Sequence, residues 1–274
     1  MSSYRRLAAI LVVAALFHSS AYSEQPVFSE MPRWDNGWGF QIVEEYRTES
    51  ELLDGEDKLG SGLSEDVHIM HLEGVYTWDK SIRLTFKLPY VIAARRELLQ
   101  SNGGKEVQHD SGLGDLTLAL PLKRYFNYED RSGSWTLAPQ LKVPLADDDE
   151  YEVYDGVWGH GLSLGYEAET YRWIFGVGST TWIYHHDEPF ETELSLKLGL
   201  NIQAFGSSGS IKWKSKLHYE GDDSTTLTAG PVLYWKFTET IHTQFQWQHD
   251  FYDYQGKLDH GRGDSFKLGF GFVF

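Results

Sequence analysis

The sequence predicts an all-β protein, a closed antiparallel transmembrane β-barrel of about twelve strands that follows a cleaved signal peptide. Three features of the sequence predict this fold. The chain ends in a strand-like segment with a large apolar residue on every second position. It begins with a short apolar run behind two arginines. Between these ends lie segments whose hydropathy alternates residue by residue and whose connections alternate in length.

The N-terminal segment has the organisation of a secretory signal peptide. Two arginines precede the apolar residues 7–17, and Ala21-Tyr22-Ser23 supplies a cleavage site with small residues. The apolar run is too short to span a bilayer as a helix, which needs roughly 20 residues. We therefore expect residues 1–23 to be removed and residues 24–274 to form one barrel domain. A buried N-terminal helix is the alternative interpretation of the run.

The composition is acidic, free of cysteine and rich in aromatic residues. Acidic residues outnumber basic ones by 40 to 24, which argues against a nucleic-acid partner. Without cysteine the chain has no disulfide framework, thiolate metal site or lipoprotein anchor, and we expect no cofactor. The mean hydropathy of −0.42 fits a membrane barrel, because its strands are apolar only at alternate residues. An aromatic content of 15% suits aromatic girdles at the two membrane interfaces.

Period-two alternation marks the strands. In residues 81–90, large apolar side chains alternate with Arg83, Thr85 and Lys87, a pattern that helical spacing does not fit. We expect about twelve such segments, an even number as in single-chain bacterial barrels. They lie near residues 37–48, 66–78, 81–94, 113–127, 133–146, 157–169, 171–183, 191–204, 209–220, 224–237, 239–252 and 264–274. The last segment ends on Phe274. With this terminal aromatic residue, the segment resembles the closing strand of bacterial outer-membrane barrels.

Residues 211–220 indicate which face of the sheet is wet. Lys212, Lys214 and Lys216 share one face, and apolar residues dominate the other. Each lysine facing lipid near the midplane would cost roughly 2–4 kcal/mol, so the lysine face is expected to line a lumen. A soluble sandwich would also keep these lysines in water. The same parity predicts a lumenal set that comprises Arg83, Lys87, Asp115, Lys123, Lys142, Lys197, Lys212, Lys214, Lys216 and Lys236.

The connections between the segments alternate between short and long. Short ones lie at residues 78–81 and 237–240, whereas longer ones lie at 49–65, 95–112, 147–156 and 253–263. Outer-membrane barrels place short turns in the periplasm and long loops outside. The long connections are acidic, most densely in residues 147–155. Such a run is usually a solvated surface, with Ca²⁺ or Mg²⁺ binding as the alternative.

Three short motifs resemble an outer-membrane family named for the meta-cleavage pathway of phenol degradation. They are Ser111-Gly-Leu-Gly-Asp115-Leu-Thr-Leu-Ala-Leu120, Leu141-Lys-Val-Pro144-Leu-Ala-Asp147 and Gly263-Asp-Ser-Phe266-Lys-Leu-Gly-Phe-Gly. The resemblance implies a barrel that passes small hydrophobic or aromatic compounds. In this sequence Gly114 and Asp115 can also be a bend at a strand entry with no transport role, because Gly readily marks such bends.

We therefore expect a channel or transporter for small molecules in the outer membrane of a Gram-negative bacterium. Its partners would be outer-membrane lipid, lipopolysaccharide, the solute, and the barrel-assembly machinery that reads Phe274. The lumenal lysines would attract anions weakly; alternatively they only neutralise acids and solvate the interior.

Two other function classes compete with transport. An outer-membrane lipid hydrolase needs a serine beside a histidine, but His160 and Ser163 are three residues apart and point to opposite faces of a strand. We therefore predict no catalytic residues. His185-His186-Asp187-Glu188 is a possible metal cluster, and interfacial decoration is the preferred interpretation of it. A structural or adhesive barrel without transport is the third class.

Overall fold

The computed structural model describes residues 36–99, 104–146, 153–154, 156–185, 189–204, 207–221 and 224–274. The predicted signal peptide, residues 1–23, lies outside these residues. Among the residues described, no helix is long and apolar enough to cross a membrane.

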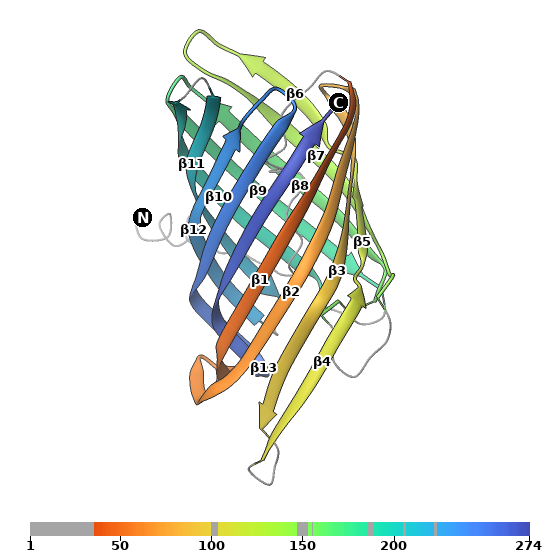
Figure 1. Ribbon diagram of the computed structural model, residues 1–274, viewed down its shortest axis with the longest axis vertical. Helices are drawn as coiled ribbons and strands as arrows, with labels where there is room; N and C mark the ends of the chain where they lie inside the picture. The colour runs from red at the N-terminus through yellow and green to blue at the C-terminus, as the bar shows by residue number, and fades with distance from the viewer. Residues whose placement is uncertain are drawn as a thin grey trace, which may run out of the picture.

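The described residues form one closed antiparallel sheet (Figure 1). β1 (Gly37–Gly55) pairs on one side with β2 (Asp57–Asp79) and on the other with β13 (Ile241–Val273), and the β2–β3 pairing closes the ring. The other strands are β3 (Ile82–Leu99), β4 (Lys105–Leu113), β5 (Leu116–Ala119), β6 (Leu122–Asn127), β7 (Ser132–Val143), β8 (Gly159–Glu169), β9 (Trp173–Tyr184), β10 (Glu191–Ala204), β11 (Ser207–Glu220) and β12 (Ser224–Lys236).

Twelve wall strands result from these elements, in agreement with the sequence prediction. β4, β5 and β6 are successive pieces of one wall strand, which pairs with β3 on one side. β13 is a hairpin whose first half pairs with β12 and whose second half pairs with β1. The N–H of Val273 donates to the carbonyl of Thr240 at 2.9 Å, where the two halves meet.

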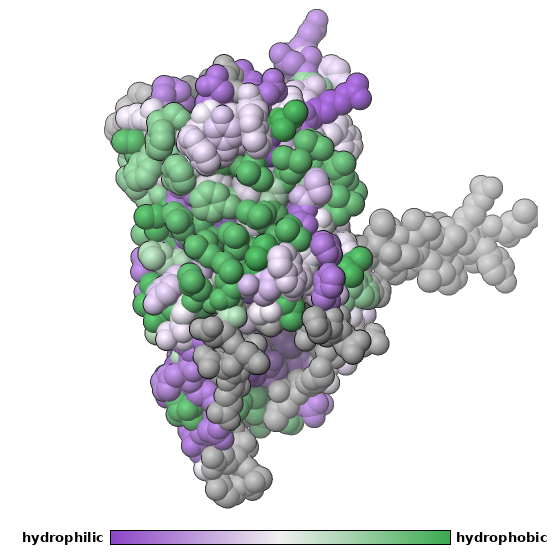
Figure 2. All heavy atoms as spheres, turned by 90° about the vertical axis from the view of Figure 1, so that its right-hand side faces the viewer, coloured by the Kyte–Doolittle hydropathy of each residue, from purple (hydrophilic) through white to green (hydrophobic). Residues whose placement is uncertain are grey.

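The barrel is apolar outside and polar inside. On β10, Leu196, Leu198 and Leu200 are 43–50% exposed, whereas Ser195 and Lys197 are at most 5% exposed. On the face drawn in Figure 2, apolar side chains form a belt across the middle of the barrel, with polar residues towards both ends, and every wall strand carries exposed apolar side chains. Because a charged side chain on the lipid face near the midplane costs roughly 2–4 kcal/mol, this alternation fits a barrel surrounded by lipid.

Aromatic residues and the C-terminal strand complete one end of the barrel. The ring centroids of Trp38 and Tyr76 lie 4.7 Å apart, and the N–H of Phe274 donates to the carbonyl of Trp38 at 3.0 Å. Gly37 has a φ of 106°, and a Cβ there would lie 2.6 Å from the carbonyl oxygen of Phe274. The short β2–β3 and β12–β13 turns are at the same end, which we call the inner end.

The opposite, outer end differs from the sequence prediction in one respect. Residues 49–65 and 253–263 were expected to be loops, but β1, β2 and β13 continue through them as paired strands. β3 and β4 likewise extend into the 95–112 connection (Figure 1). Both faces of these extensions are largely polar, because beyond the belt neither face contacts lipid. A strand that is polar on both faces has no hydropathy alternation to reveal it.

Candidate functional site

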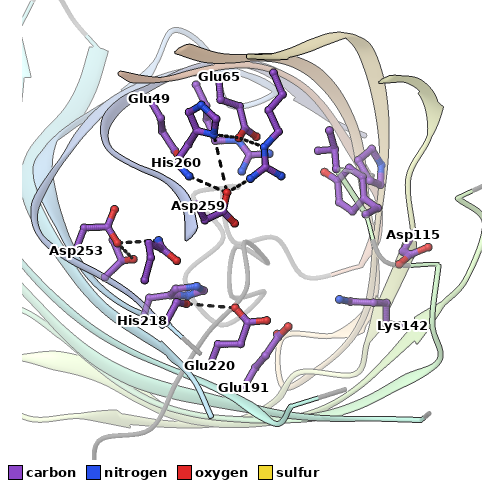
Figure 3. A pocket seen from close by; sticks show the side chains of 18 of the residues that line it. Glu49, Glu65, Asp115, Lys142, Glu191, His218, Glu220, Asp253, Asp259 and His260 are labelled. Atoms are coloured by element: carbon purple, nitrogen blue, oxygen red, sulfur yellow. Dashed lines mark hydrogen bonds and ion pairs between the residues drawn. The ribbon is translucent and has the colours of Figure 1, made fainter. Parts of the chain in front are cut away.

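The lumen contains a cavity of about 270 Å³ in its outer half (Figure 3). Among the described residues, seven carboxylate side chains line it, against four arginine or lysine side chains. The carboxylates are those of Glu49, Glu65, Asp115, Glu191, Glu220, Asp253 and Asp259. A second cavity of about 40 Å³ shares Arg47, Glu49 and His218 with the first and reaches Lys267. The two cavities are therefore neighbours, and the larger one forms an acidic vestibule.

The structure places the predicted lumenal lysines on β10 and β11 inside the barrel. Lys197, Lys212 and Lys214 are at most 7% exposed, and Lys197 lies directly opposite Lys214 in the β10–β11 register. The Nζ of Lys212 lies 5.6 Å from the ring centroid of Tyr234. Lys216, one step nearer the outer end, forms an ion pair with Glu193 at 3.2 Å. Lys197, Lys212 and Lys214 therefore lie on the interior face, about midway along β10 and β11.

Other members of the predicted set lie against specific partners. Arg83 is buried in the interior, and Lys87 lines the vestibule. Lys123 pairs with Glu167 at 3.5 Å, and Lys236 pairs with Glu239 at 2.5 Å beside an inner turn. The Nζ of Lys142 donates to the hydroxyl of Tyr184 at 2.8 Å. The set therefore shares the interior face but does not form one cluster.

Asp115 holds the start of an outer connection. It is 2% exposed, and its Oδ1 accepts hydrogen bonds from the backbone N–H groups of Leu145 at 3.1 Å and Ala146 at 3.3 Å. Gly114 and Asp115 interrupt the wall strand between β4 and β5. This geometry matches a bend at a strand entry, and it gives the carboxylate a structural task next to the vestibule.

The end of the 147–156 connection enters the lumen. The N–H of Val153 donates to Oδ2 of Asp110 at 3.0 Å, and Tyr154 packs with Val153 against a buried apolar cluster on β2 and β3. A Cβ on Gly114 would lie 2.4 Å from the ring of Tyr154, so the absence of a side chain there makes room for the ring. The rest of the acidic run, residues 147–152 and 155, lies outside the described residues. The sequence prediction treated the whole run as an exposed loop and missed this inward contact.

An aromatic wall was also missed by the sequence analysis. Trp182 is 2% exposed and stacks on Tyr184 with ring centroids 6.3 Å apart. Gly159 and Gly161 on β8 face these two rings, and a Cβ at either would lie within 2.8 Å of a ring atom. Lys142 Nζ is 4.3 Å from the centroid of Tyr184. The diluted hydropathy of the glycine-rich segments hid this wall, although alternate glycines facing alternate aromatics could have revealed it.

Burial and neighbouring carboxylates raise the pKa of one member of the vestibule, Glu49. Glu49 on β1 lies directly opposite Glu65 on β2, in the extension beyond the apolar belt. Burial, the neighbouring Glu65 and the carboxylates of Asp250 and Asp253 raise the pKa of Glu49 to about 8. Like charges near one another disfavour the ionised form, so the Glu49 carboxyl holds its proton more strongly than an isolated glutamate does.

The candidate catalytic pair is separated by the barrel wall. His160 is exposed, and its Nε2 lies 3.1 Å from Nε2 of His185. Ser163 is fully buried, and its hydroxyl hydrogen-bonds Thr180 and Gln140. The hydroxyl and the imidazole therefore face opposite sides of β8. Residues 186–188 of the candidate metal cluster lie outside the described residues.

Comparison with known proteins places the fold among outer-membrane channels. No family model and no curated protein matches the sequence. An outer-membrane channel from Pseudomonas putida F1 has a similar structure, with a TM-score of 0.71 and 18% sequence identity over 92% of this chain and 100% of that one. The KdgM porin matches with a TM-score of 0.46 and 9% identity over 85% of this chain and 99% of its own. The monoaromatic hydrocarbon channel CymD matches with a TM-score of 0.42 and 7% identity over 88% and 89% of the two chains. At 18% identity the first likeness establishes the barrel fold.

Proposed function

We propose that the protein is a channel that carries small solutes through the outer membrane of a Gram-negative bacterium. The observation that carries this proposal is the inside-out barrel, whose wall is apolar outside and whose lumen is charged and hollow. A plug made only of paired charges would leave no such vestibule. We assign no catalytic role, because the wall separates Ser163 from His160.

The charge distribution favours polar or charged solutes over neutral hydrocarbons. A neutral apolar molecule would displace water from the seven vestibule carboxylates and gain few apolar contacts in return. An aromatic compound that carries a charge is better matched, because the described residues that line the cavity include four arginine or lysine side chains, Lys142 among them, as well as the carboxylates. The motifs that resemble the phenol meta-pathway family support membership of that family and aromatic solutes. Uncharged hydrophobic or aromatic compounds are the competing substrate class.

Reconstitution tests both parts of the proposal. Purified protein refolded into planar bilayers should give discrete conductance steps, and heat-denatured protein at the same concentration should give none. Liposome swelling with a small aromatic carboxylate should exceed swelling with a neutral sugar of larger size. A folded barrel that gives neither conductance nor swelling would refute the channel. Uptake of a neutral aromatic hydrocarbon in preference to its carboxylate would refute the solute class.

A further inference from the structure

Three potential metal ligands meet at the outer mouth of the lumen. Glu65 comes from β2, and Asp259 and His260 come from the outer part of the β13 hairpin (Figure 3). One ligand atom from each residue lies within 4.8 Å of the other two. Residues separated by nearly 200 positions in the sequence are therefore brought together by closure of the barrel.

His260 is the unusual member of this group. It is 3% exposed, and its Nδ1 has no hydrogen-bond partner. That nitrogen lies 3.7 Å from Oε2 of Glu65 and 3.9 Å from Oδ1 of Asp259, too far for hydrogen bonds. A buried polar atom without a partner is rare in native structures and calls for a ligand or water. The imidazole is aimed at the two carboxylates across a gap of the size that an ion would occupy.

The surrounding charge also favours a cation. Glu49 lies directly opposite Glu65 in the β1–β2 register, and like charges in that position are destabilising. Arg96 on β3 provides the nearest compensation, because its guanidinium pairs with Asp259 and its Nε lies 3.6 Å from Oε2 of Glu65. The guanidinium thus occupies the carboxylates that a metal ion would use.

We propose that Glu65, Asp259 and His260 bind a divalent first-row transition-metal ion such as Zn²⁺, and that Arg96 holds the two carboxylates when the metal is absent. Two carboxylate oxygens and one imidazole nitrogen suit Zn²⁺, with water in the fourth position. Ca²⁺ and Mg²⁺ prefer ligand sets made of oxygen alone. Metal binding releases the guanidinium from Asp259, so metal and arginine compete for one site.

Zinc titration of the full-length protein in detergent tests this proposal. After treatment with a chelator, the protein is titrated against a fluorescent zinc chelator, and the wild type should bind one equivalent of Zn²⁺. His260→Gln should weaken binding by at least about tenfold. His249→Gln is the matched control, because His249 is half-exposed on the same hairpin and outside the cluster. Arg96→Met should tighten binding, since it removes the competing cation.

The Arg96 variant separates a built site from incidental histidine binding. If zinc bound only incidentally to a histidine, Arg96→Met would leave the affinity for Zn²⁺ unchanged. If Arg96 only supported the fold of the site, Arg96→Met would weaken Zn²⁺ binding. No binding by the wild type, unchanged binding by His260→Gln, or no gain with Arg96→Met would overturn the proposal. Heat-modifiable migration on gels establishes that each variant is folded before it is titrated.

A conductance measurement keeps this inference distinct from the proposed channel function. Zn²⁺ at the mouth adds positive charge to an acidic vestibule and should lower conductance of small cations, reversibly with chelator. Conductance without zinc binding would refute the metal site alone. Zinc binding by a barrel that does not conduct would refute the channel alone.

Discussion

At the scale of residues, the lumen carries charge of both signs. Carboxylates outnumber basic side chains among the described residues of the outer vestibule, and Lys197, Lys212 and Lys214 are buried about midway along β10 and β11. The hypothesis that lysines attract anions therefore applies to the part of the lumen beside these two strands. An ion that enters from the outer end meets the acidic vestibule first.

Reversal of the lysine charge tests this hypothesis. Replacing Lys212, Lys214 and Lys216 together with Glu should shift the reversal potential in a salt gradient towards cation selectivity, because three positive charges in the lumen would be replaced by three negative charges. Planar-bilayer recordings measure the shift.

The control carries the same change of charge on exposed turns. Lys80, Arg131 and Arg172 are all exposed at the inner end, so their replacement with Glu changes charge mainly where water and salt screen it. Equal shifts in the two triple variants would contradict a lumenal role for the three lysines.

Asp115 gives a second test at this scale. Asp115→Ala removes the acceptor of two backbone N–H groups and should destabilise the barrel by about 1–3 kcal/mol. Asp115→Asn keeps an oxygen in place and should lose less. Urea unfolding in lipid vesicles measures both. If Asn is as damaging as Ala while ion selectivity changes strongly, the carboxylate acts on solutes and does not anchor the connection.

At the scale of elements, the alternation of apolar and polar residues predicted the parts of the strands that lie within the apolar belt. It did not predict the parts that extend beyond the belt. The face of β10 that contacts lipid must be apolar, so the alternating Leu196, Leu198 and Leu200 predict that strand from the sequence. Residues 49–65 lie beyond the apolar belt, so neither face of the sheet there needs to be apolar and the hydropathy does not alternate. The strands β1 and β2 were therefore predicted too short. The inward turn at Val153 and Tyr154 depends on tertiary contacts with β2 and β3, which no local pattern encodes.

The inward contact of Tyr154 should limit flow through the vestibule. Tyr154→Ala removes the ring that fills the space above Gly114, and single-channel conductance should rise as the vestibule widens. Tyr171→Ala is the matched control, because Tyr171 is 85% exposed at an inner turn. A Tyr154→Ala channel with wild-type conductance would show that this contact does not restrict the pathway.

At the scale of the whole molecule, closure of the sheet creates sites that the sequence does not display. The number of strands could be predicted by counting the alternating segments, and the burial of Lys197, Lys212 and Lys214 agrees with their alternation with apolar residues. The cluster of Glu65, Asp259 and His260 could not, because it requires knowing which outer ends meet around the ring. Trp182 and Tyr184 were hidden for a different reason, because the glycines of β8 and β9 dilute the hydropathy pattern of both strands.

The orientation of the sheet is the central claim, and cysteine scanning along β10 tests it most directly. The chain has no cysteine, so single replacements at positions 195 to 200 introduce the only thiol. In lipid vesicles a small water-soluble thiol reagent should label Ser195→Cys and Lys197→Cys, whereas Leu196→Cys and Leu198→Cys should stay protected. Uniform labelling, or labelling with the opposite parity, would contradict a barrel with lipid outside and water inside.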